Sequence, residues 1–156
     1  LMPYVMELEA YYLVQRLSFY LKRSLMFNLL KDIDSFEFWE GAKNNRLMIQ
    51  KTEISKKFFL YSRAFSGVSP SEPAKWVKSS GKGIIYSFTV SHIPGGSEFY
   101  INKTPYIIGS ILLNEGVRIM SNIVDCEASK VKIGIPVNVV FKKLDVDIVF
   151  PCFTLS

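Results

Sequence analysis

Histidine and cysteine are scarce in this sequence of 156 residues, which has one histidine, His92, and two cysteines, Cys126 and Cys152. The cysteines form no Cys-x2-Cys pair, so their spacing indicates neither a metal site nor a redox motif. Histidine is the usual acid–base catalyst and a common metal ligand, so one histidine argues against a self-contained hydrolase site. We expect both cysteines to be free thiols, with Cys152 buried in an apolar strand.

The sequence also lacks an uninterrupted apolar run long enough to cross a membrane. Residues 7–31 are rich in Leu, Tyr, Phe and Met, but Arg16, Lys22 and Arg23 interrupt them, and a span needs about 20 apolar residues. We predict a helix here that packs on its own domain or on another protein. A homodimer through this helix is a further alternative. Two cysteines without a signal-peptide pattern favour a cytoplasmic location.

Charge is not gathered into a stripe of one sign. The net charge of +5 is compatible with an anionic ligand such as a nucleotide or a coenzyme, but the scattered lysines and arginines are not typical of a nucleic-acid-binding surface. The sequence has no nucleophile elbow, phosphate-binding loop or metal cluster, so we predict that the protein is not an enzyme. With 49% hydrophobic residues, a packed core is expected.

What the sequence has in quantity is strand-forming segments. Residues 84–90 are rich in β-branched and aromatic side chains, and Gly81-Lys82-Gly83 before them allows the backbone to bend or to approach another strand closely. Further strands are predicted at residues 105–113, 117–124, 137–142 and 148–153, with a turn at residues 114–116 and one helical turn within residues 125–130. Five strands with short connections suit the five-stranded OB-fold barrel.

The part before the barrel is less regular. We predict a short helix at residues 36–44 that ends at Asn44-Asn45, because asparagine tolerates the left-handed cap. A short strand at residues 46–51 follows. Residues 52–73 are a loop-rich segment with one hairpin, in which aromatic and basic residues lie side by side.

Several short motifs occur in order along the chain: Phe38-Trp39-Glu40-Gly41 with Arg46-Leu47, then Gly81-Lys82-Gly83 before Tyr86-Ser87-Phe88-Thr89-Val90, then Pro105-Tyr106, Asn114-Glu115-Gly116 and Ile133-Gly134-Ile135-Pro136-Val137. In this order and spacing they resemble the acyl-CoA-associated OB-fold family, over residues 35–153. The resemblance implies an α+β, mainly β fold. It places N-terminal helices at residues 1–45, a rubredoxin-like zinc-ribbon module at residues 46–78 and an OB-fold at residues 79–156.

The resemblance also implies a function. Family members usually sit beside thiolase-superfamily enzymes, some are joined to hydratases, and archaeal members scaffold a complex of acetoacetyl-CoA thiolase with hydroxymethylglutaryl-CoA synthase. It therefore implies a non-catalytic scaffold subunit of lipid metabolism that docks a thiolase or hydroxymethylglutaryl-CoA synthase-type enzyme and helps to bind or channel acyl-CoA. The alternative is an OB-fold that binds single-stranded nucleic acid, which needs aromatic and basic residues interleaved on one barrel face.

One departure from the family is clear. Its ribbon carries two Cys-x2-Cys pairs, and the matching positions here fall near Thr52 and Ser55 and near Ser66 and Ser69. Neutral hydroxyls are poor zinc ligands, so we expect a degenerate ribbon without zinc. Aromatic side chains are expected to form its core in place of the metal: Phe58, Phe59, Tyr61 and Phe65.

A coenzyme A ligand would require basic groups, an aromatic face and an apolar groove. The candidate binding residues are Lys56, Lys57, Arg63, Trp76, Lys78, Lys82, His92 and Lys103. For the lysines a solvated surface role is the alternative, and for His92 a structural or partner contact. Trp39 and Trp76 are expected to pack between modules.

Overall fold

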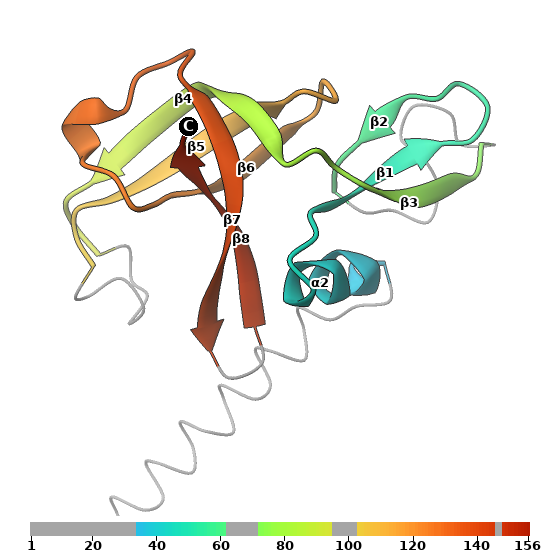
Figure 1. Cartoon of the computed structure of the whole chain (residues 1–156), viewed down its shortest axis with the longest axis horizontal. Coiled ribbons are helices and arrows are strands. Elements are labelled where there is room, and N and C mark those ends of the chain that lie inside the picture. The colour runs from blue at the N-terminus through green and yellow to red at the C-terminus, as the bar shows by residue number, and fades with distance from the viewer. Residues whose placement is uncertain (1–33, 62–71, 95–102, 146–147) are drawn as a thin grey trace, which may run out of the picture. The chain divides into compact units, whose positions relative to one another are not determined.

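The computed structural model describes residues 34–61, 72–94, 103–145 and 148–156 (Figure 1). The helix predicted at residues 7–31 lies outside the described residues. Residues 37–156 form one compact unit. Among the described residues, no helix is long and apolar enough to cross a membrane.

Helix α2 (Phe36–Lys43) ends where the sequence predicts. Asn45 adopts a left-handed φ of +55°. Its N–H donates to the Ala42 carbonyl (3.0 Å), and the Arg46 N–H donates to the Gly41 carbonyl (2.8 Å). This pair of bonds is the Schellman pattern, which satisfies the last helical carbonyls and turns the chain back toward the next strand.

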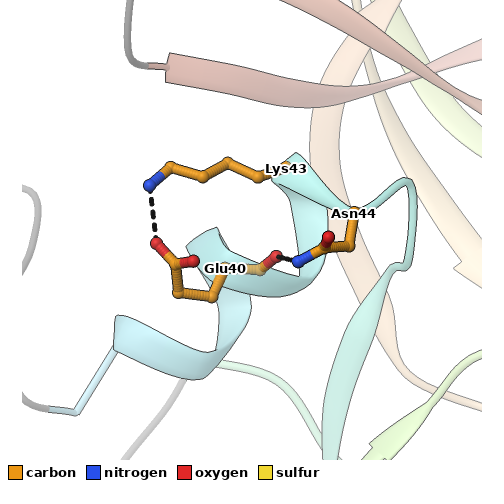
Figure 2. A network of polar contacts seen from close by, with 3 residues as sticks. All are labelled: Glu40, Lys43 and Asn44. Atoms are coloured by element: carbon orange, nitrogen blue, oxygen red, sulfur yellow. Dashed lines mark hydrogen bonds and ion pairs between the residues drawn. The ribbon is translucent and has the colours of Figure 1, made fainter.

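Side chains reinforce the same helix end, as Figure 2 shows. The Asn44 amide donates to the Glu40 carbonyl at 2.8 Å, and Lys43 forms an ion pair with the Glu40 carboxylate at 2.6 Å. Both ends of the ion pair are exposed, and exposed pairs contribute little stability. The backbone closure therefore fixes the position of the strand that follows.

That strand belongs to a three-stranded antiparallel sheet in the order β2-β1-β3. Its strands are β1 (Met48–Thr52), β2 (Phe58–Phe59) and β3 (Ala74–Lys78). Strand β3 was not predicted, because Ala-Lys-Trp-Val-Lys is short and follows Pro73. The ribbon-like sheet, as we call these three strands, leads directly into the barrel through Ser79, Ser80 and Gly81.

The barrel is closed, and its strand order is β4-β5-β6-β8-β7. Its elements are β4 (Lys82–Ser91), β5 (Tyr106–Leu113), β6 (Arg118–Ile123), the 3₁₀-helix η2 (Ala128–Lys130), β7 (Pro136–Asp145) and β8 (Ile148–Leu155). This is the order of a five-stranded OB-fold, so the predicted fold class, α+β and mainly β, is confirmed. The turn at residues 114–116 and the helical turn before β7 are also confirmed.

Closure depends on close backbone approach at Gly83 on β4. Gly83 pairs with Leu113 of β5 on one side and Val137 of β7 on the other. A Cβ at this position would overlap the carbonyl oxygen of Leu112. Two residues earlier, Gly81 takes φ +70° and bends the chain into the barrel. Both roles predicted for Gly81-Lys82-Gly83, the bend and the close approach, are therefore present.

The core is mainly aliphatic, and most of it lies inside the barrel. Its largest fully buried side chain is Phe153 of β8, and Leu47 and Ile49 join it from the ribbon-like end. The other buried members are Ile85, Ile107, Ile111, Leu113, Ile119, Ile123, Val131 and Val137. The rings of Trp39 and Phe150 lie 5.1 Å apart and hold α2 against β8, so the packing role predicted for Trp39 is confirmed.

Gly83→Ala is expected to destabilise the barrel by about 2 kcal/mol or more, because the added methyl meets backbone that cannot move aside. Urea unfolding followed by circular dichroism would measure this loss. The neighbouring exposed position supplies the control, since Lys82→Ala should change stability by less than about 0.5 kcal/mol. Equal stabilities of the two variants would contradict the close approach.

Candidate functional site

The outer face of β4, β5 and β6 carries large side chains that the core does not use. The inward residues of these strands fill the barrel, whereas Ile84, Tyr86 and Met120 are 40%, 50% and 65% exposed. Leu112 pairs with Ile84 on one side and Arg118 on the other, so it lies on the same outer face. We call Ile84, Tyr86, Leu112, Arg118 and Met120 the barrel patch.

Arg118 organises the barrel patch. Its guanidinium lies over the ring of Tyr86, 4.8 Å from the ring centre. Because Arg118 is on β6 and Tyr86 on β4, the two side chains meet across the intervening strand β5. Stacking of this kind holds an exposed arginine in one orientation, and the guanidinium loses little hydration. The patch thus presents an ordered combination of tyrosine, arginine, methionine and aliphatic groups.

Glu115, in the β5–β6 turn, anchors the chain that joins the ribbon-like sheet to the barrel. Its carboxylate accepts hydrogen bonds from the buried Ser79 hydroxyl (3.0 Å) and from the Ser80 N–H (2.6 Å). The Ser79 hydroxyl in turn accepts from the Gly81 N–H at 3.0 Å. Partial burial alone would raise the pKa of Glu115, but these donors outweigh burial and hold the pKa below its usual range.

The residues at the family's first cysteine pair do not fit zinc. Thr52 Oγ1 and Ser55 Oγ are hydrogen-bonded to each other at 2.7 Å, and Thr52 is fully buried. Neutral hydroxyls lack the charge and softness of thiolates. Among the residues that the structure describes, no group of three His, Cys, Asp or Glu could hold a metal ion. Ser66 and Ser69 lie outside the described residues.

The predicted aromatic core of the ribbon-like sheet needs one correction. Phe58 and Phe59 form β2 and are half-buried, but Tyr61 is 64% exposed and does not take part. Tyr61 has φ +70°, so the chain turns away directly after β2. Phe65 lies outside the described residues.

The predicted ligand residues of the ribbon-like sheet occupy two places. Trp76 and Lys78 are two residues apart on β3, so they share one face of the sheet. Lys56 and Lys57 are exposed in the turn between β1 and β2. Arg63 lies outside the described residues.

The predicted ligand residues of the barrel lie at opposite ends of β4, with Lys82 at its start and His92 and Lys103 near its end, where Ser91 pairs with Tyr106. Lys82 begins β4, and His92 directly follows its end. A ten-residue strand extends about 30 Å. Lys103, which is also exposed, precedes β5. No single subsite therefore contains both Lys82 and His92, and coenzyme binding by these residues stays a prediction.

Both cysteines are free thiols, as predicted. Burial raises the pKa of the Cys152 thiol, which is buried in β8, and it also raises that of Cys126. Neither thiol is therefore poised as a nucleophile.

Comparison with known proteins places the barrel in a family. Residues 76–142 match the model described as the ChsH2 C-terminal OB-fold domain. A DUF35 domain-containing scaffold protein of Methanocaldococcus jannaschii is 39% identical over 71 residues, 46% of this chain and 49% of that protein. A probable enoyl-CoA hydratase alpha subunit of Thermomonospora curvata is 31% identical over 117 residues, 74% of this chain and 36% of that protein.

A solved structure gives the same result in three dimensions. A chain of the Ltp2-ChsH2(DUF35) aldolase superposes with a TM-score of 0.71 at 27% identity, covering 80% of this chain and 95% of that one. By contrast, the chain spans half or less of the length of the two curated relatives. The similarity therefore concerns a shared part and not the whole of those proteins.

Glu115→Gln is expected to lower the free energy of unfolding at pH 7 by about 1–2 kcal/mol, since a charged acceptor of two hydrogen bonds becomes neutral. Because the pKa is lowered from its usual 4.5 in the folded state, this stabilisation is complete above that value and is lost as pH falls through the lower folded pKa. The variant should thus lose less stability than the wild type on acidification.

Denaturant unfolding at several pH values would measure the difference. The matched control is Glu127→Gln, because Glu127 is exposed and its ion pair with Lys130 is long at 3.6 Å and therefore weak. If Glu115→Gln and Glu127→Gln followed one pH profile, Glu115 would not anchor the connection.

Proposed function

Because the chain belongs to the acyl-CoA-associated OB-fold family, also called DUF35, we propose that it is a non-catalytic scaffold subunit that docks an enzyme acting on acyl-CoA. The barrel patch is the observation that carries this proposal. Its side chains are those that protein interfaces favour, namely tyrosine, arginine and methionine with aliphatic neighbours. Apolar groups exposed on a closed barrel gain most when a partner protein covers them.

The chemistry of the chain supports a scaffold over an enzyme. Within the described residues, the two thiols have raised pKa values, and His92 stands at a strand end. The hydrogen bonds that Ser79 and Ser80 donate to the Glu115 carboxylate, and that Gly81 donates to Ser79, hold the backbone. Such groups stabilise a fixed shape but provide no nucleophile with an adjacent base.

The names of the relatives support an enzyme subunit as the class of partner. One is a scaffold protein, one is the alpha subunit of a probable enoyl-CoA hydratase, and the similar structure belongs to an aldolase assembly. For this chain we favour a thiolase-superfamily enzyme as the partner, with acyl-CoA passing along the shared surface. Trp76 and Lys78 supply an aromatic and a cationic group on one face for the nucleotide end of the coenzyme.

Single-stranded nucleic acid fits the barrel patch less well. Such binding needs a positively charged groove with aromatic side chains along it. On the outer face of β4–β6, the basic residues are Lys82 and Arg118, at the same end, and Arg118 is already engaged with Tyr86. The remainder of the patch is mainly apolar, which favours a protein partner.

Met120→Asp is expected to reduce capture of the enzyme partner by at least about tenfold, because a carboxylate within a docked apolar face would lose its water. The full-length tagged chain would be used to recover the partner from native extract, with quantification by mass spectrometry. Unfolding midpoints of the free chain should be unchanged, since Met120 is 65% exposed.

Ile93→Asp is the matched control, because Ile93 is equally apolar and 76% exposed but lies beyond the far end of β4. A thiolase-type enzyme captured by the wild type and Ile93→Asp, but not by Met120→Asp, supports the proposal. Equal capture by all three chains would show that the docking surface lies outside the barrel patch. Capture of oligonucleotides in place of an enzyme would overturn the scaffold role.

A further inference from the structure

A buried carboxylate stands beside the turn where the family carries its first cysteine pair. Glu72 is 6% exposed and precedes β3. One of its oxygens, Oε1, accepts the backbone N–H of Ile54 at 2.6 Å and that of Ser55 at 2.5 Å. A single carboxylate oxygen thus binds two successive N–H groups of the β1–β2 turn across 17 to 18 residues of sequence.

The same turn is closed from within by Thr52. The Thr52 hydroxyl accepts the Lys57 N–H at 2.8 Å and is bonded to the Ser55 hydroxyl at 2.7 Å. The Thr52 N–H donates to the Lys57 carbonyl at 2.9 Å, and the Glu53 N–H donates to the Pro73 carbonyl at 3.1 Å. Four successive N–H groups, from Thr52 to Ser55, therefore have acceptors within the protein.

The electrostatics agree with this geometry. The Ser55 N–H lowers the pKa of Glu72 most, and burial opposes it. The Ser55 hydroxyl, the Ile54 N–H and the Thr52 hydroxyl lower the pKa further. The carboxylate is therefore held as an anion, which makes its hydrogen bonds charge-assisted and stronger than neutral ones.

We propose that the Glu72 carboxylate, with the hydroxyls of Thr52 and Ser55, takes the structural place of a metal centre in the ribbon-like sheet. A zinc site with thiolate ligands ties a turn to a distant strand. Its negatively charged sulfur atoms accept hydrogen bonds from the turn's N–H groups. Glu72 does both, since it is anionic, lies next to β3 and binds the turn after β1. The sheet is then a metal-independent fold and not a zinc ribbon with a damaged site.

This inference does not depend on the docking role. It concerns what holds β1, β2 and β3 together, so the barrel patch could serve any partner and the carboxylate would still be required. It also explains why hydroxyl residues at positions 52 and 55 are compatible with a folded sheet: they are short donors and acceptors that complete the network around an anion.

The first test measures amide hydrogen exchange and metal content in the full chain. Glu72→Ala is expected to speed exchange at Ile54 and Ser55 by about tenfold or more, because both N–H groups lose their acceptor. Glu53→Ala is the control, since the Glu53 side chain is exposed and its backbone bond to Pro73 remains. The wild type should contain no stoichiometric zinc, and a chelator should leave its melting temperature unchanged.

Two results would overturn the inference. One is a stoichiometric zinc ion in the wild type whose removal lowers the melting temperature. The other is Glu72→Ala with the same exchange rates as Glu53→Ala, which would show that the carboxylate does not hold the turn. If Glu72→Ala failed to fold, Glu72→Gln would be used, which keeps the shape and removes the charge. Its exchange at Ile54 and Ser55 should still be faster than in the wild type.

A second test restores the family's cysteines by the changes Thr52→Cys, Ser55→Cys, Ser66→Cys and Ser69→Cys. Cobalt(II) should bind this variant with thiolate charge-transfer absorption, and in the metal-bound form Glu72→Ala should no longer speed exchange in the turn. A variant that does not bind cobalt would overturn the assignment of these positions to the metal site. A cobalt-bound form that remains as sensitive to Glu72→Ala would contradict the equivalence of carboxylate and metal.

Discussion

The pairing of β4 with strands on both of its sides is the constraint on which the rest of the structure depends. At Gly83 the backbone of β4 is hydrogen-bonded within both the β5 and the β7 ladders, and only a residue without a side chain allows that approach. Closure removes the sheet edges that would otherwise pair with other chains. It also divides the side chains into two sets, those that fill the core and those, such as Tyr86 and Met120, that face outward.

Outside the barrel strands, two carboxylates hold segments of the chain in place. Glu115 binds the connection at Ser79 and Ser80, and Glu72 binds the turn at Ile54 and Ser55. Both accept backbone N–H groups at places where the chain is neither helix nor ladder, and so supply partners that regular structure cannot. Because each acts as an anion, the ribbon-like sheet and its connection should be more sensitive to acid than the aliphatic core.

Much of the barrel could be predicted from the sequence, because its evidence is local. A run rich in β-branched and aromatic residues indicates a strand by itself, Asn114-Glu115-Gly116 indicates a turn, and Gly81-Lys82-Gly83 indicates a close approach. Strand β3 could not be predicted, since its formation depends on pairing with β1. Glu72 and the barrel patch were missed for the same reason. Only the register of the strands brings Arg118 over Tyr86, and only the fold brings Glu72 to Ile54.

The most direct test of the account is the structure, by electron cryomicroscopy, of the full chain in complex with the enzyme that co-purifies with it from native cells. The account predicts a thiolase-superfamily enzyme seated on the outer face of β4–β6, with Tyr86, Arg118 and Met120 buried in the interface. It also predicts that no metal density lies beside Glu72. A complex in which the barrel patch stays in solvent, while β7 and β8 contact the partner, would contradict the central claim.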